Sequence, residues 1–487
     1  MNGISILLAI ASVTFAAAPD SGEGVSADRS WGQWRGPVAS GVAPDAKPPI
    51  TWSEKKNIRW KVAIPGQGLS TPIVWGELVF LQAAIPVNPK AQDEPDESKK
   101  PDDDRAGRGE RGERGAPGDG AQRDRRGDRP RGEGRRGPGG GRGRRGGMRR
   151  AAPTERYTFS VIALDRRTGK EVWRRSVREA VPHEGNHRDG SLAPASPVTD
   201  GNHLYAYFGS RGLYCLTMSG EVVWEKDLGD MKTRNGFGEG SSPALLGDTL
   251  VVNWDHEGDS FIVALDKATG KEKWRRERDE VTSWSTPLFI EDAGRWQVVV
   301  SAANRVRSYD LATGDVVWEC GGLGVNCTPT PVANAGLLFA MSGYRNPALL
   351  AIRYAGAKGD LTDSSTVVWT TDKGTSYVPS PLLYGDTLYF LQRNSGILSC
   401  LDPKTGKPHY DQQRLEGISG VYASPVGAGD HVYIVGRDGK TMVLKRSSSF
   451  ETVAVNQLDD SFTASPAIAG NELFLRGMKH LYCIAGK

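Results

Sequence analysis

Cysteine and long apolar runs are both scarce in this sequence. There are five cysteines in 487 residues, no two of them adjacent, and the first is Cys215. No cysteine stands near the N-terminus for lipid attachment, so we expect a protein that is not a lipoprotein. Beyond residue 18 no segment approaches the roughly 20 apolar residues of a membrane-spanning helix, which predicts a chain without transmembrane segments. Charge is balanced as well, with a formal net charge of +4.

The first residues predict export. Residues 1–18 form a short apolar stretch that ends in small side chains, as secretory signal peptides do. Cleavage is expected after Ala18 or after Ala27, so residues 1–27 are assigned to the signal and 28–487 to one domain. We therefore expect a monomer that is periplasmic or associated with the cell envelope and does not bind nucleic acid.

A repeat dominates the rest of the chain, which is rich in glycine (61) and tryptophan (13). Eight segments begin with Ser or Thr before Pro and continue with alternating apolar residues around a Gly, Asp or Asn turn. From the second segment onward their spacing is about 40–50 residues, the length of one four-stranded propeller blade. The eight anchors are Thr71-Pro72, Ser196-Pro197, Ser242-Pro243, Thr286-Pro287, Thr330-Pro331, Ser380-Pro381, Ser424-Pro425 and Ser465-Pro466.

A second motif marks the last hairpin of several units. Residues 163–173 read ALDRRTGKEVW, 264–274 read ALDKATGKEKW and 308–318 read SYDLATGDVVW. Gly supplies the positive φ that the turn needs, and the Trp on the outer strand is expected to pack over the neighbouring blade. We assign this structural role to six tryptophans: Trp60, Trp173, Trp224, Trp274, Trp318 and Trp369.

Counting strands predicts how the ring closes. The last unit, which begins at Ser465, supplies three strands, and residues 57–64 read as an isolated outer strand that carries Trp60. Inserting that strand into the last unit would remove the exposed edges. The expected fold is an all-β, eight-bladed β-propeller of four-stranded antiparallel blades, closed by an N-terminal strand that joins the last blade.

The repeated motif resembles the tryptophan-docking repeats of the pyrroloquinoline-quinone (PQQ)-like β-propeller family. That family includes quinoprotein alcohol dehydrogenases and BamB-like proteins, and the resemblance covers about residues 57–487 apart from one insertion. It implies either a dehydrogenase of alcohols or sugars that uses PQQ with calcium, or a BamB-like scaffold without a cofactor. A dehydrogenase of this family commonly carries adjacent cysteines against the quinone, and this sequence has none.

Residues 88–153 interrupt the first blade. They run from acidic to Arg/Gly-rich and contain almost nothing apolar. Such a segment cannot offset its ordering entropy, so we expect a disordered surface loop between the second and third strands of the blade. The segment is either a tolerated insertion or a tether for a polyanion.

One face of the ring is expected to carry the ligand- or partner-binding residues. An arginine recurs in the connection between the second and third strands of six blades, as Arg211, Arg305, Arg345, Arg393, Arg437 and Arg476. Guanidinium groups can capture carboxylates or phosphates in bidentate fashion. The alternative is that each arginine pairs with an acid of a neighbouring blade.

The same face should also carry His183, His187, Arg234 and His256. Imidazoles beside carboxylates can bind a divalent metal or transfer protons. The His-Glu-Gly-Asn-His run at 183–187 does not suit a helical zinc motif, however, because it contains Gly185 and Asn186. We therefore assign no metal site and no catalytic residue, and a polar loop network is the alternative to a site.

The cysteines divide into two groups. Cys215, Cys400 and Cys483 occupy matching third-strand positions in different blades and are expected to be small buried side chains. Cys320 and Cys327 flank one connection between blades, and the sequence leaves open whether they form a disulfide after export.

These patterns favour an exported, non-catalytic scaffold that binds protein partners or an anionic ligand in the cell envelope. No cofactor is assigned. The alternative is a quinoprotein dehydrogenase with PQQ and calcium, and the docking tryptophans do not separate the two because they belong to the fold.

Overall fold

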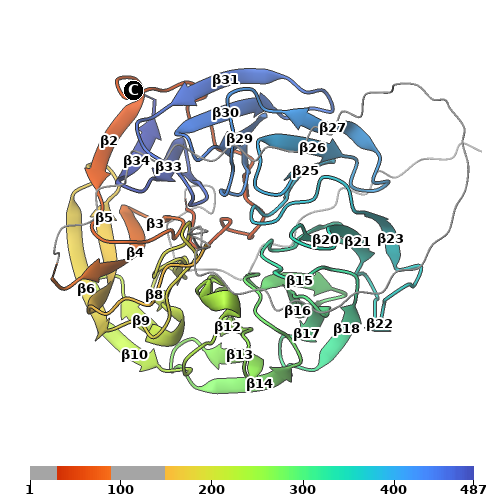
Figure 1. Cartoon of the computed structure of the whole chain (residues 1–487), viewed down its shortest axis with the longest axis horizontal. Helices are drawn as coiled ribbons and strands as arrows, with labels where there is room; N and C mark the ends of the chain where they lie inside the picture. The colour runs from red at the N-terminus through yellow and green to blue at the C-terminus, as the bar shows by residue number, and fades with distance from the viewer. Residues whose placement is uncertain (1–29, 89–147, 487) are drawn as a thin grey trace, which may run out of the picture. The chain divides into compact units, whose positions relative to one another are not determined.

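The computed structural model describes residues 30–88 and 148–486. The assigned signal and most of the insertion lie outside these residues. Eight β-sheets follow one another in sequence around a common axis, which confirms the all-β, eight-bladed propeller (Figure 1). Within blades 1 to 7 the four strands pair antiparallel and in chain order, from the innermost strand to the outermost. There is no helix in the described residues with the length and apolar character to cross a membrane.

The first four blades contain these strands. Blade 1 has β3 (Ile73–Trp75), β4 (Leu78–Pro86), β5 (Tyr157–Asp165) and β6 (Glu171–Ala180). Blade 2 has β7 (Val198–Thr199), β8 (His203–Tyr207), β9 (Leu213–Thr217) and β10 (Val222–Lys226). Blade 3 has β11 (Ala244–Leu246), β12 (Thr249–Trp254), β13 (Ser260–Asp266) and β14 (Glu272–Arg278). Blade 4 has β15 (Leu288–Asp292), β16 (Arg295–Ser301), β17 (Val306–Asp310) and β18 (Val316–Cys320).

The other four blades complete the ring. Blade 5 has β19 (Val332–Asn334), β20 (Leu337–Ser342), β21 (Ala348–Arg353) and β23 (Val367–Thr371). Blade 6 has β24 (Leu382–Tyr384), β25 (Thr387–Leu391), β26 (Ile397–Leu401) and β27 (Pro408–Arg414). Blade 7 has β28 (Val426–Ala428), β29 (His431–Val435), β30 (Lys440–Lys445) and β31 (Thr452–Gln457). Blade 8 has β32 (Ala467–Ala469), β33 (Glu472–Arg476) and β34 (His480–Ala485). Short 3₁₀ turns, η2 (Gly209–Arg211) and η3 (Arg234–Gly236), lie in loops.

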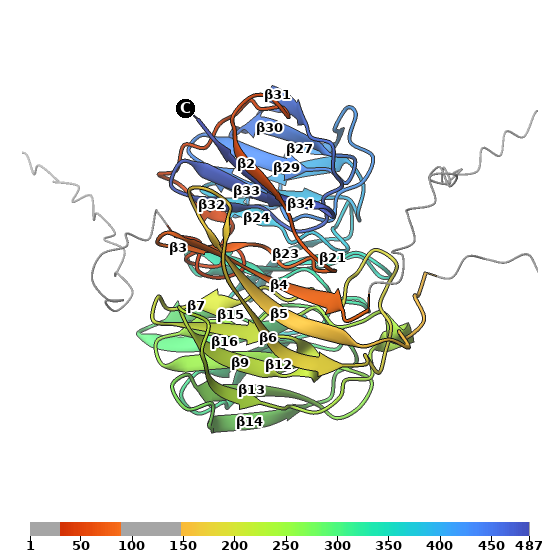
Figure 2. The same cartoon turned by 90° about the vertical axis from the view of Figure 1, so that its left-hand side faces the viewer.

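Ring closure follows the prediction. Strand β2 (Ile58–Ala63) pairs antiparallel with β34 as the fourth strand of blade 8, with Trp60 opposite Cys483 (Figure 2). Residues from the two ends of the described chain thus share one sheet. No edge is left between the first and last blades, and the buried residues of blades 1, 7 and 8 form one continuous apolar core.

The Asp-x-x-Thr-Gly turns explain the regularity of the outer hairpins. In blade 1 the Asp165 carboxylate accepts hydrogen bonds from the Thr168 backbone N–H (2.8 Å) and hydroxyl (2.6 Å). Gly169 follows with φ +72°, a conformation that glycine adopts without steric cost. The same carboxylate contacts recur in blade 3 between Asp266 and Thr269. The turn therefore presents its glycine in the same position each time.

Five of the six tryptophans dock on the next blade. In each case the indole N–H donates to a backbone carbonyl of the next blade's outer turn, at 2.8–3.0 Å. The ring covers the turn glycine so closely that a Cβ there would lie 2.5–2.9 Å from it. Docking requires glycine at this position for both reasons, its φ and its lack of a side chain. The five pairs are Trp60 with Gly169, Trp173 with Gly220, Trp224 with Gly270, Trp274 with Gly314, and Trp369 with Gly406.

Trp318 is the exception. Its indole N–H donates to the Gln297 side chain of its own blade at 3.1 Å, although the ring is fully buried among residues of blades 4 and 5. Blade 5 lacks the tight turn, because a longer connection (354–366) joins β21 to β23. In that connection β22 (Gly359–Asp360) pairs in parallel with β18 and extends the sheet of blade 4.

The outer strands of blades 6 and 7 carry no tryptophan, and these blades contact the N-terminal segment, residues 30–57, instead. Strand β1 (Val42–Ala43) pairs with β28 of blade 7, and Trp52 stacks on Tyr433 with ring centroids 6.4 Å apart. Arg35 is buried and donates to the carbonyls of Pro381 (2.6 Å) and Pro425 (2.7 Å), which belong to blades 6 and 7. Burial lowers the pKa of the Arg35 guanidinium to about 9, so it stays charged at neutral pH.

All five cysteines are free and buried. Cys320, at the end of the outer strand β18, and Cys327, in the connection towards blade 5, do not form a disulfide. Their thiols face different carbonyls, those of Gly321 and Met341. Cys215, Cys400 and Cys483 lie on the third strands of blades 2, 6 and 8, as expected.

Candidate functional site

One face of the propeller collects the longer connections. In each blade the link between the second and third strands, and the link from the fourth strand to the next blade, emerge at the same end of the sheet. We call this end the loop face. It includes the residues beside the insertion: Arg149 forms a β-bridge with His187, and the Arg150 N–H donates to the Asn186 carbonyl at 2.8 Å. Residues 148–153, which the sequence assigned to the insertion, are thus described as part of the propeller.

The eight Ser/Thr anchors form a hydrogen-bonded belt around the channel. In blades 1 to 7 the backbone N–H of the anchor donates to the hydroxyl of the next blade's anchor, which gives seven bonds of 2.9–3.1 Å. The Thr71 hydroxyl stands where an eighth bond would close the belt, and it has no partner among the described residues. The hydroxyls therefore act as structural acceptors, which accounts for Ser or Thr at every anchor.

Three segments narrow the channel inside this belt. Trp34 reaches it from the N-terminal segment, while Trp284 and Tyr422 reach it from connections between blades. The cavity that remains is about 120 Å³. Sites for drug-sized ligands measure roughly 300–1,000 Å³, so this cavity is small for a cofactor.

A clamp of three side chains spans part of the channel mouth. Asp189, in the connection between blades 1 and 2, pairs with Arg437 of blade 7 at 2.8 Å and accepts the Tyr422 hydroxyl at 3.1 Å. Arg437 also lies over the Tyr422 ring, 4.5 Å from its centroid. Burial favours the protonated carboxyl, but Arg437 and Tyr422 outweigh it and hold the pKa of Asp189 below its usual value. The clamp joins blades that are not adjacent in the ring.

The six predicted arginines do not form a ring of free guanidinium groups. Arg211 pairs with Asp230 at 3.3 Å, and Arg305 pairs with Asp360 at 3.1 Å. Arg437 belongs to the clamp. Arg476 is buried and bonds to Ser70, and burial lowers its pKa to about 9. Only Arg345 and Arg393 of the six are exposed without a carboxylate partner among the described residues.

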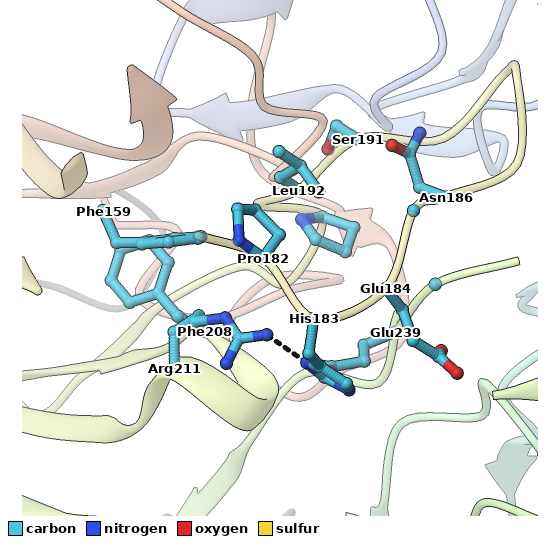
Figure 3. Close-up of a pocket in the computed structure, with 13 residues that line it drawn as sticks. Phe159, Pro182, His183, Glu184, Asn186, Ser191, Leu192, Phe208, Arg211 and Glu239 are labelled. Carbon is cyan, nitrogen blue, oxygen red and sulfur yellow. Dashed lines mark hydrogen bonds between the residues drawn. The ribbon is translucent and has the colours of Figure 1, made fainter. Parts of the chain in front are cut away.

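His183 and Arg211 line a small pocket between blades 1 and 2 (Figure 3). The Arg211 guanidinium contacts the Nδ1 side of His183, whose Nε2 lies 2.6 Å from the Met231 carbonyl. Glu239, in the same pocket, accepts the Ser210 backbone N–H (2.9 Å) and hydroxyl (2.5 Å), and burial raises its pKa. The polar groups thus satisfy one another, and the pocket, of about 40 Å³, holds little more than water.

The other predicted polar residues also serve the loops. His256 is buried, accepts the Lys232 backbone N–H at Nδ1 (3.0 Å) and contacts the Asp259 carbonyl through Nε2 (3.2 Å). His187 packs edge-on against Phe237, and burial lowers its pKa. Arg234 belongs to η3, where its backbone N–H donates to Thr282 at 2.9 Å. Within the described residues, no group of three or more His, Cys, Asp or Glu is placed to hold a metal ion.

Sequence reasoning missed a buried ion pair in blade 3. Asp255 and Arg278 of blade 3 form a bidentate pair (2.7 and 3.1 Å) with both side chains fully buried. Ser283 donates to the same carboxylate at 2.6 Å, and Arg278 also donates to the Tyr309 hydroxyl of blade 4. A lone Asp and a lone Arg 23 positions apart gave no signal of pairing. The hydroxyl belt did carry a signal, since every anchor has a hydroxyl residue before its proline.

A quinone cofactor does not fit this channel. PQQ with calcium would need a flat slot and a set of acidic ligands. The cavity is small, its wall consists of anchor hydroxyls engaged between blades, and Arg437 beside it is paired with Asp189. The five separate, buried cysteines offer no disulfide to cover a quinone.

Comparison with known proteins identifies relatives of this fold. A family model described as the outer membrane protein assembly factor BamB matches residues 158–412, slightly more than half of the chain. No curated protein matches the sequence significantly.

Solved structures share the architecture at low sequence identity. The quinohemoprotein alcohol dehydrogenase of Comamonas testosteroni aligns with a TM-score of 0.58 and 10% identity, over 95% of this chain and 82% of its own. A europium-containing methanol dehydrogenase aligns with a TM-score of 0.54 and 8% identity, over 93% of this chain and 90% of its own. BamB of Moraxella catarrhalis has 15% identity and a TM-score of 0.46, over 66% of this chain and 91% of its own. The two dehydrogenase alignments establish a common fold and no more.

Proposed function

This chain belongs to the family of the outer membrane protein assembly factor BamB, and from that premise we propose that it is a non-catalytic scaffold that binds partner proteins through its loop face. The proposal includes export to the periplasm or cell envelope, which rests on the N-terminal signal pattern and on the outer-membrane role in the family's description. Quinoprotein dehydrogenase activity is the competing function.

One observation carries the proposal: the channel mouth, where a propeller enzyme would bind its cofactor, is occupied by the protein's own side chains. The Asp189–Arg437–Tyr422 clamp spans part of the channel mouth, and Trp34 and Trp284 narrow the channel cavity. Most of the predicted site residues are engaged within the protein: Arg211, Arg305 and Arg437 pair with carboxylates, and His183 and His256 contact groups of neighbouring loops. A site for acid–base or redox chemistry needs groups that are free to meet a substrate, whereas a scaffold needs only exposed loops on a rigid ring.

Calorimetric titration of the mature protein with PQQ, with and without calcium, tests this proposal. A scaffold predicts no saturable heat under either condition and no dye-linked oxidation of alcohols or sugars. Saturable, calcium-dependent binding at one site, followed by oxidation, would establish the dehydrogenase instead. The Asp189→Ala variant is the control for blocked access, because it removes the clamp from the channel mouth. A scaffold predicts that this variant does not bind PQQ either.

A further inference from the structure

We propose that four residues on blades 5 and 6, Tyr344, Arg345, Tyr377 and Arg393, form a docking site for an acidic, extended peptide segment of another protein. We call these residues the Tyr-Arg patch. The inference rests on the proposed scaffold function and names the surface and the kind of partner it takes.

The four residues form one continuous surface on the loop face. Arg345 lies over the Tyr344 ring, 5.5 Å from its centroid, and Tyr344 stacks on Tyr377 at 5.2 Å with an interplanar angle of 29°. The Tyr377 backbone N–H donates to the Arg393 carbonyl at 3.2 Å, and the Arg393 N–H donates to the Thr375 carbonyl at 2.8 Å. Two neighbouring loops and the connection between them thus hold two tyrosines between two arginines.

The charge of the patch is uncompensated. Arg345 and Arg393 are exposed, and neither has an ion pair with any described carboxylate. At the equivalent positions of blades 2, 4 and 7, the arginines pair with Asp230, Asp360 and Asp189. Guanidinium groups recognise carboxylates in bidentate geometry, so two free ones on adjacent loops suit a ligand with more than one carboxylate.

The aromatic part of the patch favours a peptide over a small anion. Tyr344 is 41% exposed and already ordered by its stack on Tyr377. Tyrosine and arginine are enriched among residues that dominate protein–protein binding, because each offers a large contact at low entropic cost. A small anion would use one guanidinium and leave the rings uncovered, whereas an extended chain can cover the rings between two carboxylate contacts.

The backbone also holds Arg393 in a conformation that its own side chain does not favour. Its φ is +52°, in the left-handed region where glycine or asparagine is the usual choice. In the turn that carries Arg345, the residue in the left-handed region is Asn346, at φ +53°. Strain of this kind concentrates at functional positions, and at residue 393 it accompanies an exposed arginine that makes no ion pair within the described chain.

Fluorescence anisotropy with a labelled Glu-rich peptide that contains one Tyr tests the inference on the mature protein. The Arg345→Glu/Arg393→Glu variant should bind the peptide at least about tenfold more weakly than wild type, and raising the salt concentration should weaken wild-type binding. Arg353→Glu is the matched control: the same charge reversal at an exposed residue of blade 5, at the opposite end of β21. It should leave binding unchanged.

Three outcomes would overturn the inference: no peptide binding by wild type, equal losses in the double variant and the control, or binding only to heparin or to phosphatidylglycerol vesicles. The last would assign the patch to a polysaccharide or a membrane. None of these outcomes would support the dehydrogenase function, which depends on PQQ binding in the channel. PQQ binding, in turn, would not by itself show that the Tyr-Arg patch does not bind the peptide. The two proposals therefore fail separately.

Discussion

Blades 1–4 and blades 5–6 use the same residue types on the loop face to different ends. In the first group, arginines and histidines meet carboxylates or carbonyls of neighbouring loops, as in Arg211 with Asp230 and the fully buried Arg278 with Asp255. In the second group, Arg345 and Arg393 stand exposed beside stacked tyrosines. A repeated position thus fixes where a side chain emerges, while the neighbouring loop decides whether it is satisfied within the protein or left for a partner.

The blade interfaces differ in parallel. Tryptophan docking runs without interruption from blade 8 through blades 1 to 4. It is missing between blades 4 and 5, where the 354–366 connection replaces the tight turn, and it occurs once more between blades 5 and 6 through Trp369. The docked interfaces are nearly identical, so they can be disturbed by the same small changes. The interface of blades 4 and 5 has β22 instead, and the N-terminal segment contacts blades 6 and 7.

The largest effect is expected at the buried ion pair of blade 3. Asp255→Asn keeps the shape of the side chain but leaves the buried Arg278 guanidinium without its counter-charge, which should cost about 3–5 kcal/mol of unfolding free energy. Urea unfolding measures the loss. Asp360→Asn, at the exposed partner of Arg305, should leave the midpoint almost unchanged. Equal midpoints for both variants would show that the internal pairing of blades 1–4 does not stabilise them.

A single methyl group tests docking. At Gly314 (φ +76°) a Cβ would lie 2.5 Å from the Trp274 ring, whereas at Gly247 (φ +58°) it would meet nothing within 4 Å. Both alanine variants pay the left-handed backbone penalty of about 1 kcal/mol. Gly314→Ala should lose a further ~2 kcal/mol by overpacking. If thermal or urea unfolding gives the same loss of unfolding free energy for both variants, the Trp274 ring moves aside at no cost. Docking would then not stabilise the blade interface.

The clamp should contribute about 1–2 kcal/mol at neutral pH, and its contribution should depend on pH. The pKa of Asp189 is lowered in the folded protein, since Arg437 and Tyr422 outweigh burial. The stabilisation is therefore complete above the unfolded-state pKa of about 3.9 and disappears as pH falls through the lower folded-state pKa. The difference in unfolding free energy between wild type and Asp189→Asn should shrink below pH ~4. A difference that stays constant with pH would contradict the role of the carboxylate.

The smallest expected change in stability is an increase, and it concerns the exposed patch on blades 5 and 6. Arg393→Gly relieves the left-handed backbone of an exposed residue and should stabilise the protein by up to about 1 kcal/mol, while weakening binding of the acidic peptide. Thermal unfolding and anisotropy on the same sample measure both changes. A variant that is less stable than wild type would show that Arg393 serves the fold.

The repeats allowed the architecture to be predicted almost completely. The Ser/Thr-Pro anchors and the Asp-x-x-Thr-Gly turns each have a local physical cause, so they signal blades wherever they occur, and the closing strand followed from counting. The failure of Trp318 to dock was not predictable in the same way, because docking depends on the turn of the next blade, and in blade 5 a longer connection replaces that turn.

The site was less accessible to sequence reasoning. The connections between strands placed all six arginines on the loop face, but their partners lie in other loops, some on blades far apart in sequence. Asp189 and Arg437 are 248 positions apart and meet only when the ring has closed. Distinguishing a satisfied arginine from a free one therefore required the three-dimensional arrangement.

Hydrogen–deuterium exchange of the mature protein, with and without the Glu-rich peptide, tests the contrast between the two regions most directly. Protection on binding should be confined to the loops at residues 343–347, 375–381 and 392–395. The clamp connection around residues 183–193 should exchange slowly in both states and not change. Protection at the clamp or the channel mouth, with none in the loops of blades 5 and 6, would contradict the proposed docking site. It would place peptide binding at the channel mouth instead.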